Sequence, residues 1–260
     1  MSPYLLIILQ SIAFPFGLSG LLLWRAGHRD VYKVIGNVLI WLIAYAWIIQ
    51  WPELPPGEAV DWLWLLLVAG IAARYIAHRQ MRLFYRTAVF ASMITAIAWP
   101  VLHYQPSIAV VSELVILIVA GHVLFSRIEQ IQAVAPALTL TIQATGLAIA
   151  CALSGSLLVG QLSAALAAVI GGYAILEIFG RLRKTLFSAQ QSLVFLPLYL
   201  SLLAIARLYA ELPSVTTILL LAGPVFCVLV PWRHSWVISL LFNACAIGLV
   251  LMNSDNTAYY

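Results

Sequence analysis

The apolar segments of this chain are separated by gaps that are alternately basic and acidic. Ten apolar stretches can be counted, and with the first gap in the cytoplasm every Lys and Arg except Arg207 falls on the cytoplasmic side. The acidic residues of the opposite side are Glu53, Glu58, Asp61, Glu211 and Asp255. Because basic loops are retained in the cytoplasm during insertion, this alternation sets the direction of each span. It predicts an all-α, polytopic integral membrane protein with both termini outside.

The composition agrees with lipid as the surrounding solvent. The 260 residues are 64% hydrophobic and 8% charged, whereas soluble domains are about 45–50% apolar and about 25% charged. A soluble fold of this length could not bury so much apolar surface, so the excess is expected to face lipid. The net charge of +4 is explained by basic cytoplasmic loops, and no nucleic-acid partner is expected.

The apolar stretches have lengths suited to transmembrane helices, which need about 17–25 residues. The expected helices are Tyr4–Trp24, Val34–Trp51, Trp62–Ala77, Leu83–Leu102, Ile108–Phe125, Ala137–Ser156, Ser163–Gly180, Ser192–Ala210, Thr216–Pro231 and Trp236–Met252. The longest outer loop, Pro52–Asp61, is expected to be stiff and solvated because it is rich in proline and acids. The loops are too short to form a soluble domain, so residues 1–260 are expected to form one transmembrane domain with any site in the helix bundle.

The ten segments also divide into two sets of five, residues 1–125 and 137–252. An odd number of helices in each set would insert the second set upside down, and short similar stretches occur in both, such as Ala98–Leu102 and Ala222–Phe226. Inverted repeats with broken helices are typical of transporters. Chance similarity between apolar sequences is the alternative, because the spacing between the matching Arg and Pro residues differs between the halves.

Two charged residues lie inside apolar segments on the outer side. Glu113 is five residues past the start of the fifth segment, roughly 8 Å deep at about 1.5 Å per residue. Intramembrane carboxylates often mark proton or ion pathways, and the alternative is a structural bond between helices. Arg207 can pair with Glu113 across helices or with Glu211 four residues further along the chain. The local pair is favoured because helical i,i+4 geometry permits it at little cost.

Other polar or irregular positions complete the candidate site. Glu177 is expected to pair with Arg181 at i+4. Gln143 and Asn243 lie inside helices and can either bond across helices or line a cavity. Gly223 and Pro224 lie in mid-span and are the best candidates for a break that frees backbone carbonyls. The substrate or coupling candidates are Glu113, Arg207, Glu177, Gln143, Asn243, Gly223 and Pro224.

No catalytic residue, metal site or cofactor is predicted. The sequence contains none of the common zinc-protease, dithiol or nucleotide-binding motifs. Cys151, Cys227 and Cys245 all lie in apolar segments and are interpreted as small core residues.

Three functions are compatible with these observations. The first is a small-molecule transporter or permease, multi-pass in the plasma membrane. The bacterial inner membrane is favoured because the chain has no N-glycosylation acceptor. The second is a non-catalytic subunit or scaffold that binds other membrane proteins, which the sparse polar residues suggest. An intramembrane lipid-modifying enzyme ranks last, because no titratable cluster lies at one depth. The expected partners are the lipid bilayer and a small-molecule substrate, or membrane-protein partners in the second case.

Overall fold

The computed structural model describes residues 3–25, 30–49, 51, 56–76, 78–104, 107–128, 136–178, 189–230 and 235–257. Within these ranges the chain is all-helical, with 93% of residues in helices and no strands. Eight helices are long and apolar enough to cross a membrane, which supports a membrane-embedded, multi-pass protein. The third and ninth expected segments form shorter apolar helices, Ala59–Ala72 and Ser214–Leu229.

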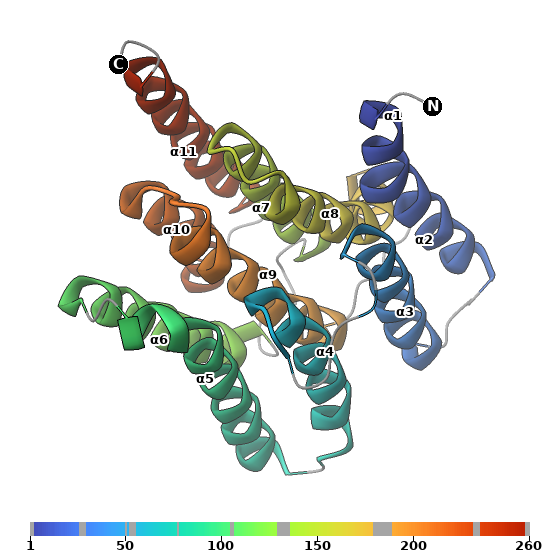
Figure 1. Cartoon of the computed structure of the whole chain (residues 1–260). Coiled ribbons are helices and arrows are strands. Elements are labelled where there is room, and N and C mark those ends of the chain that lie inside the picture. Colours follow the sequence, from blue (N-terminus) through green and yellow to red (C-terminus); the bar gives the residue numbers. More distant parts are fainter. Residues whose placement is uncertain are drawn as a thin grey trace.

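The helices follow the predicted apolar segments along the chain (Figure 1). In order they are α1 (Pro3–Ile8), η1 (Leu9–Ala13), α2 (Phe14–Arg25), α3 (Asp30–Ile49), η2 (Ala59–Trp62), α4 (Leu63–Ala72), η3 (Ala73–Tyr75), α5 (Arg79–Tyr104), α6 (Ile108–Ile128), α7 (Pro136–Leu153), α8 (Leu157–Ile178), α9 (Ala189–Tyr209), α10 (Ser214–Leu229) and α11 (Ser235–Thr257).

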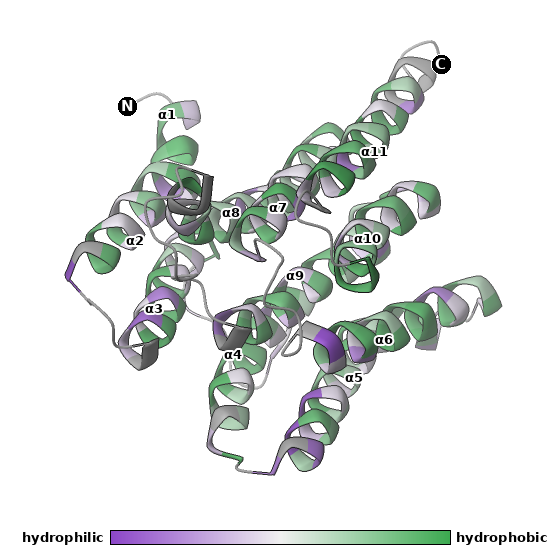
Figure 2. Ribbon diagram, turned by 180° about the vertical axis from the view of Figure 1, so that it is seen from behind, coloured by the Kyte–Doolittle hydropathy of each residue, from purple (hydrophilic) through white to green (hydrophobic). Residues whose placement is uncertain are grey.

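Helix α9 forms the centre of the bundle. It contacts α4, α5, α6, α7, α8 and α10, and Figure 1 shows it between α7 and α8 on one side and α4 and α5 on the other. In α9, 83% of the most apolar stretch is buried, whereas the corresponding share is 22% in α5, α6 and α11. Figure 2 shows hydrophobic residues along the lengths of the peripheral helices. A largely buried central helix with less buried helices around it is the arrangement expected when lipid is the outer solvent.

The turn between α7 and α8 is tighter than the sequence predicts. The expected helices end at Ser156 and restart at Ser163, but α8 begins at Leu157. Gly155 takes a left-handed conformation with φ +86°. The N–H of Ser156 donates to the Cys151 carbonyl at 2.9 Å, and the N–H of Gly155 donates to Ala152 at 3.3 Å. This is a Schellman motif, which glycine forms without steric penalty.

The predicted break at Gly223 and Pro224 is wrong. Helix α10 runs without interruption from Ser214 to Leu229 with Pro224 inside it. The irregular turn is instead η1, a π-helical stretch that precedes Pro15. A proline lacks an N–H, and its ring collides with the carbonyl four residues earlier. A widened turn is one way in which a helix accommodates that collision.

The loop before α4 is exposed at Gly57 and Glu58, as expected, but its last acid is buried. Residues 52–55 lie outside the described part of the chain, but Asp61 is only 5% exposed. Its carboxylate accepts hydrogen bonds from the N–H groups of Gly57 at 3.1 Å and Glu58 at 2.9 Å. Glu58 and Asp61 form a capping box, and this box sets where η2 and then α4 begin.

Candidate functional site

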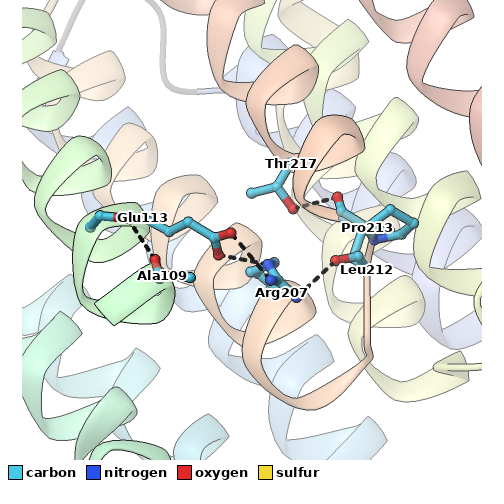
Figure 3. A network of polar contacts seen from close by, with 7 residues as sticks. Ala109, Glu113, Arg207, Leu212, Pro213 and Thr217 are labelled. Atoms are coloured by element: carbon cyan, nitrogen blue, oxygen red, sulfur yellow. Dashed lines mark hydrogen bonds and ion pairs between the residues drawn. The ribbon is translucent and has the colours of Figure 1, made fainter. Parts of the chain in front are cut away.

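Arg207 and Glu113 form a bidentate ion pair between α9 and α6 (Figure 3). The Arg207 Nε lies 2.7 Å from Glu113 Oε2, and Nη2 lies 3.2 Å from Oε1. The remaining Nη1 donates to the Leu212 carbonyl at 3.4 Å. Two parallel N–H···O bonds are the strong geometry for a guanidinium and a carboxylate. The hypothesis of a pair across helices is therefore the one that the geometry supports.

The favoured local pair between Arg207 and Glu211 is wrong. Helix α9 ends at Tyr209, so helical i,i+4 geometry does not extend to Glu211. Glu211 has φ +52°, a left-handed conformation that turns the chain out of the helix axis. The N–H of Leu212 then donates to the Ala206 carbonyl at 3.2 Å, and the Glu211 side chain is exposed.

An open pocket lies beside this ion pair, between α6, α9 and α10. Its cavity volume is about 30 Å³, and the figure rises to about 460 Å³ only when the open space at its mouth is counted. Glu113, Arg207, Ser214 and Thr217 supply its polar groups, and the rest of the lining is apolar. The side chains of Arg207 and Glu113 are 26% and 21% exposed. Most of the surface of the pair is thus covered by neighbouring residues.

A second polar group lies where α7, α9 and α10 meet. Gln143 of α7 is fully buried and packs against Gly223 of α10, where a Cβ atom would overlap the amide nitrogen. The Tyr199 hydroxyl of α9 lies 3.2 Å from Gln143 Oε1 and 2.9 Å from the Leu220 carbonyl. Gly223 therefore makes room for a polar side chain from a neighbouring helix.

Pro224 explains why Tyr199 binds the Leu220 carbonyl. Leu220 is four residues before Pro224, so its carbonyl has lost its helical N–H partner. The Tyr199 hydroxyl, which has one hydrogen to donate, replaces that partner. The Gln143 Oε1 atom is the second acceptor within reach of this hydroxyl, while the Gln143 Nε2 atom is buried without a hydrogen-bond partner.

Asn243 of α11 approaches α7 one turn away from Gln143. It is 5% exposed and lies against Gly146, where a Cβ atom would overlap its side-chain oxygen. Its Nδ2 donates to the Ser239 carbonyl at 2.8 Å, while Oδ1 is buried without a hydrogen-bond partner. The structure therefore gathers Gln143, Asn243, Gly223 and Pro224 around α7 and α10, apart from the Glu113–Arg207 pair.

Some candidates were misjudged and others were missed. The backbone of Glu177 is in α8, but its side chain and the whole of Arg181 lie outside the described residues. Sequence reasoning missed Tyr199 and Gly146. The signals were available: Pro224 predicts an orphan carbonyl at Leu220, and Gly146 is three residues from Gln143 on the same helical face.

Among the described residues no three His, Cys, Asp or Glu side chains form a group that could hold a metal ion.

Gly223→Ala is expected to lower the free energy of unfolding by about 1 kcal/mol. Alanine normally favours a helix over glycine by about 1 kcal/mol, but here the new methyl group must displace the buried Gln143 amide. The midpoint of thermal unfolding in a mild detergent measures the effect. Gly248→Ala in α11 is the matched control, because its Cβ would meet no atom within 4 Å and the change should be neutral or stabilising. Equal midpoints for both variants would contradict the close packing at Gly223.

Because comparison with known proteins finds no match, the site is interpreted from its own chemistry. No family model, curated protein or solved structure matches the chain. The described residues include one ion pair beside an open pocket and one neutral hydrogen-bonding group in the bundle interior.

Proposed function

We propose that the protein is a small-molecule transporter or permease. The observation that carries the proposal is the bidentate Glu113–Arg207 pair at an open pocket between three helices. The pair joins two different helices, so exchanging either partner for a substrate group or a proton would loosen the contact between α6 and α9. Ionisable groups inside a membrane bundle commonly belong to substrate or ion pathways.

The buried polar group supports the same proposal. Tyr199 is the middle residue of the 21-residue helix α9, and Gln143 and Gly223 also lie well inside their helices. Transporters place substrate groups near the bilayer midplane, where helices expose backbone carbonyls. The Leu220 carbonyl, bound by Tyr199 in this conformation, is such a group. A substrate that leaves the outer pocket would next reach the Leu220 carbonyl, which lies further along α10.

The proposed topology has ten spans in the plasma membrane, of the bacterial inner-membrane type, with both termini outside. Two shorter apolar helices, Ala59–Ala72 and Ser214–Leu229, would join the eight long ones as spans. Figures 1 and 2 draw the start of α1 and the end of α11 toward the same edge of the bundle, as an even number of spans requires. The inverted five-plus-five repeat stays a prediction.

Uptake by reconstituted protein tests the proposal. Liposomes that contain the protein are given an imposed proton gradient and a panel of metabolites. The protein should take up at least one of them, and Glu113→Gln should abolish that uptake because Arg207 then loses its charged partner. Glu211→Gln is the matched control, because Glu211 is an exposed acid that follows α9 and does not line the pocket.

Two outcomes would contradict this proposal. Identical uptake by the parent protein and Glu113→Gln would remove the proposed role of the carboxylate. A complete lack of uptake, combined with fixed protein partners that co-purify in mild detergent, would favour the alternative of a non-catalytic membrane subunit.

A further inference from the structure

The pocket beside the ion pair opens toward lipid. Ile116 of α6 and Ile218 of α10 both line it, and each is 51% exposed. They lie on the outward faces of their helices, next to Val115 and Val215, which are 52% and 59% exposed. Inside apolar spans, such exposed faces contact acyl chains. The pocket therefore has a lateral mouth between α6 and α10.

The polarity of the pocket changes with depth. Its charged groups and Ser214 lie toward the outer helix ends, while Leu117 and Leu221 line the inner part. Leu117 is four residues deeper than Glu113 along α6, or about 6 Å, and Leu221 is seven residues deeper than Ser214 along α10, or about 10 Å. A lipid in the outer leaflet has the same order, because its headgroup lies toward the outside and its acyl chains lie toward the bilayer centre. The shape and the lining thus suit an amphiphile that enters sideways.

The charges of the pocket select the headgroup. Glu113 and Arg207 hold each other through two hydrogen bonds, and Arg207 Nη1 also donates to the Leu212 carbonyl, so a ligand that separates the pair has to supply partners for both charges. An anion would leave the carboxylate unpaired and a cation would leave the guanidinium unpaired, and an unpaired charge in a covered site is costly. A zwitterion alone provides both partners at once.

We propose that this pocket binds a zwitterionic phospholipid with a primary ammonium group, of the phosphatidylethanolamine type, from the outer leaflet. The planar Arg207 fork matches the phosphate oxygens, and the Glu113 carboxylate accepts N–H bonds from the ammonium. A choline headgroup has no N–H to donate, and a glycerol headgroup has no positive charge. The inference rests on the proposed transporter function, since the lipid is then the transported molecule.

Competition between lipids tests the binding step. The full-length protein in detergent is mixed with equal amounts of phosphatidylethanolamine, phosphatidylcholine and phosphatidylglycerol with identical acyl chains, and the retained lipids are counted by native mass spectrometry. Phosphatidylethanolamine should be retained about tenfold over the others, the preference that one charge-assisted hydrogen bond of ordinary strength confers. The double variant Glu113→Gln/Arg207→Gln leaves no unpaired charge and should lose the preference, while Glu211→Gln should keep it.

Equal retention of the three lipids by the unmodified protein would overturn the inference, whether or not the double variant folds. A preference that persists in a folded double variant would overturn it as well. Translocation is measured separately, with tail-labelled fluorescent phosphatidylethanolamine in liposomes and a membrane-impermeant reductant. Preferential binding without lipid movement supports the site and shows that the lipid is not the transported molecule, while metabolite uptake still decides the transporter proposal. Metabolite uptake with equal lipid retention overturns the site and leaves the transporter proposal standing.

Discussion

Tyr199→Phe is expected to lower the free energy of unfolding by about 1–3 kcal/mol. The hydroxyl is the hydrogen-bond donor to the Leu220 carbonyl at 2.9 Å, and Pro224 has removed the N–H that would otherwise bind that carbonyl. Tyr199 is fully buried, so water cannot replace the lost donor, and a buried acceptor left without a partner costs about 1–3 kcal/mol. The midpoint of thermal unfolding and a denaturant titration in the same detergent both measure the loss.

A second substitution tests this explanation directly. Pro224→Ala returns an N–H to the position from which the helix can bind the Leu220 carbonyl. Tyr199→Phe should therefore cost less than about 1 kcal/mol in the Pro224→Ala background. The N–H restored at position 224 can still bind the Leu220 carbonyl after the tyrosine hydroxyl has been removed. Additive losses in the double variant would show that the tyrosine does not substitute for the missing N–H.

Tyr209→Phe is the matched control for burial. Its hydroxyl donates to the Ile97 carbonyl at 2.6 Å, three residues before Pro100 in α5. Tyr209 is 44% exposed and lies at the end of α9, and Ile97 is four residues before Val101, which has a helical N–H to offer. Its loss should be clearly smaller than that of Tyr199→Phe. Losses of equal size would mean that neither burial nor the missing proline N–H makes the Tyr199 hydrogen bond important.

The sequence was informative about polarity and much less so about partners. The alternation of charges and the apolar lengths predicted a helical membrane protein and located its segments, because both depend on long-range transfer between water and lipid. Gln143 and Asn243 were identified as polar groups inside helices for the same reason. Their partners were missed, since a glycine such as Gly146 or Gly223 reveals a close approach only when the facing helix is known.

Local backbone geometry accounts for the remaining errors. The Arg207–Glu211 pair would have required α9 to continue past Tyr209, and the left-handed turn at Glu211 occurs at a residue that does not favour it. Pro213 indicates that a helix ends shortly before it, but it does not indicate a left-handed turn at Glu211. Pro224 was expected to break α10 because its helix was considered alone, whereas Tyr199 from α9 satisfies the orphan carbonyl and lets the helix continue. The second error arose because the segment was considered without its neighbour.

Arg207→Glu is expected to lower the free energy of unfolding by about 2–3 kcal/mol and to abolish substrate uptake. The change removes a bidentate pair and sets two carboxylates against each other in a largely apolar surround. Breaking a fully buried pair costs about 3–5 kcal/mol. The expected loss is smaller here because 21–26% of each side chain is exposed and solvent screens part of the repulsion. Thermal unfolding in detergent and uptake in liposomes report the two effects.

Charge reversal at the partner identifies which carboxylate matters. Glu113→Arg combined with Arg207→Glu recreates an ion pair of opposite polarity between α6 and α9 and should recover at least half of the lost stability. Glu211→Arg in the same Arg207→Glu background is the control, and it should recover nothing, because Glu211 follows the end of α9 in a left-handed turn that takes the chain out of the helix. Rescue by Glu211→Arg but not by Glu113→Arg would show that Arg207 pairs along its own chain segment. The pocket would then lose the charged pair on which its proposed selectivity depends.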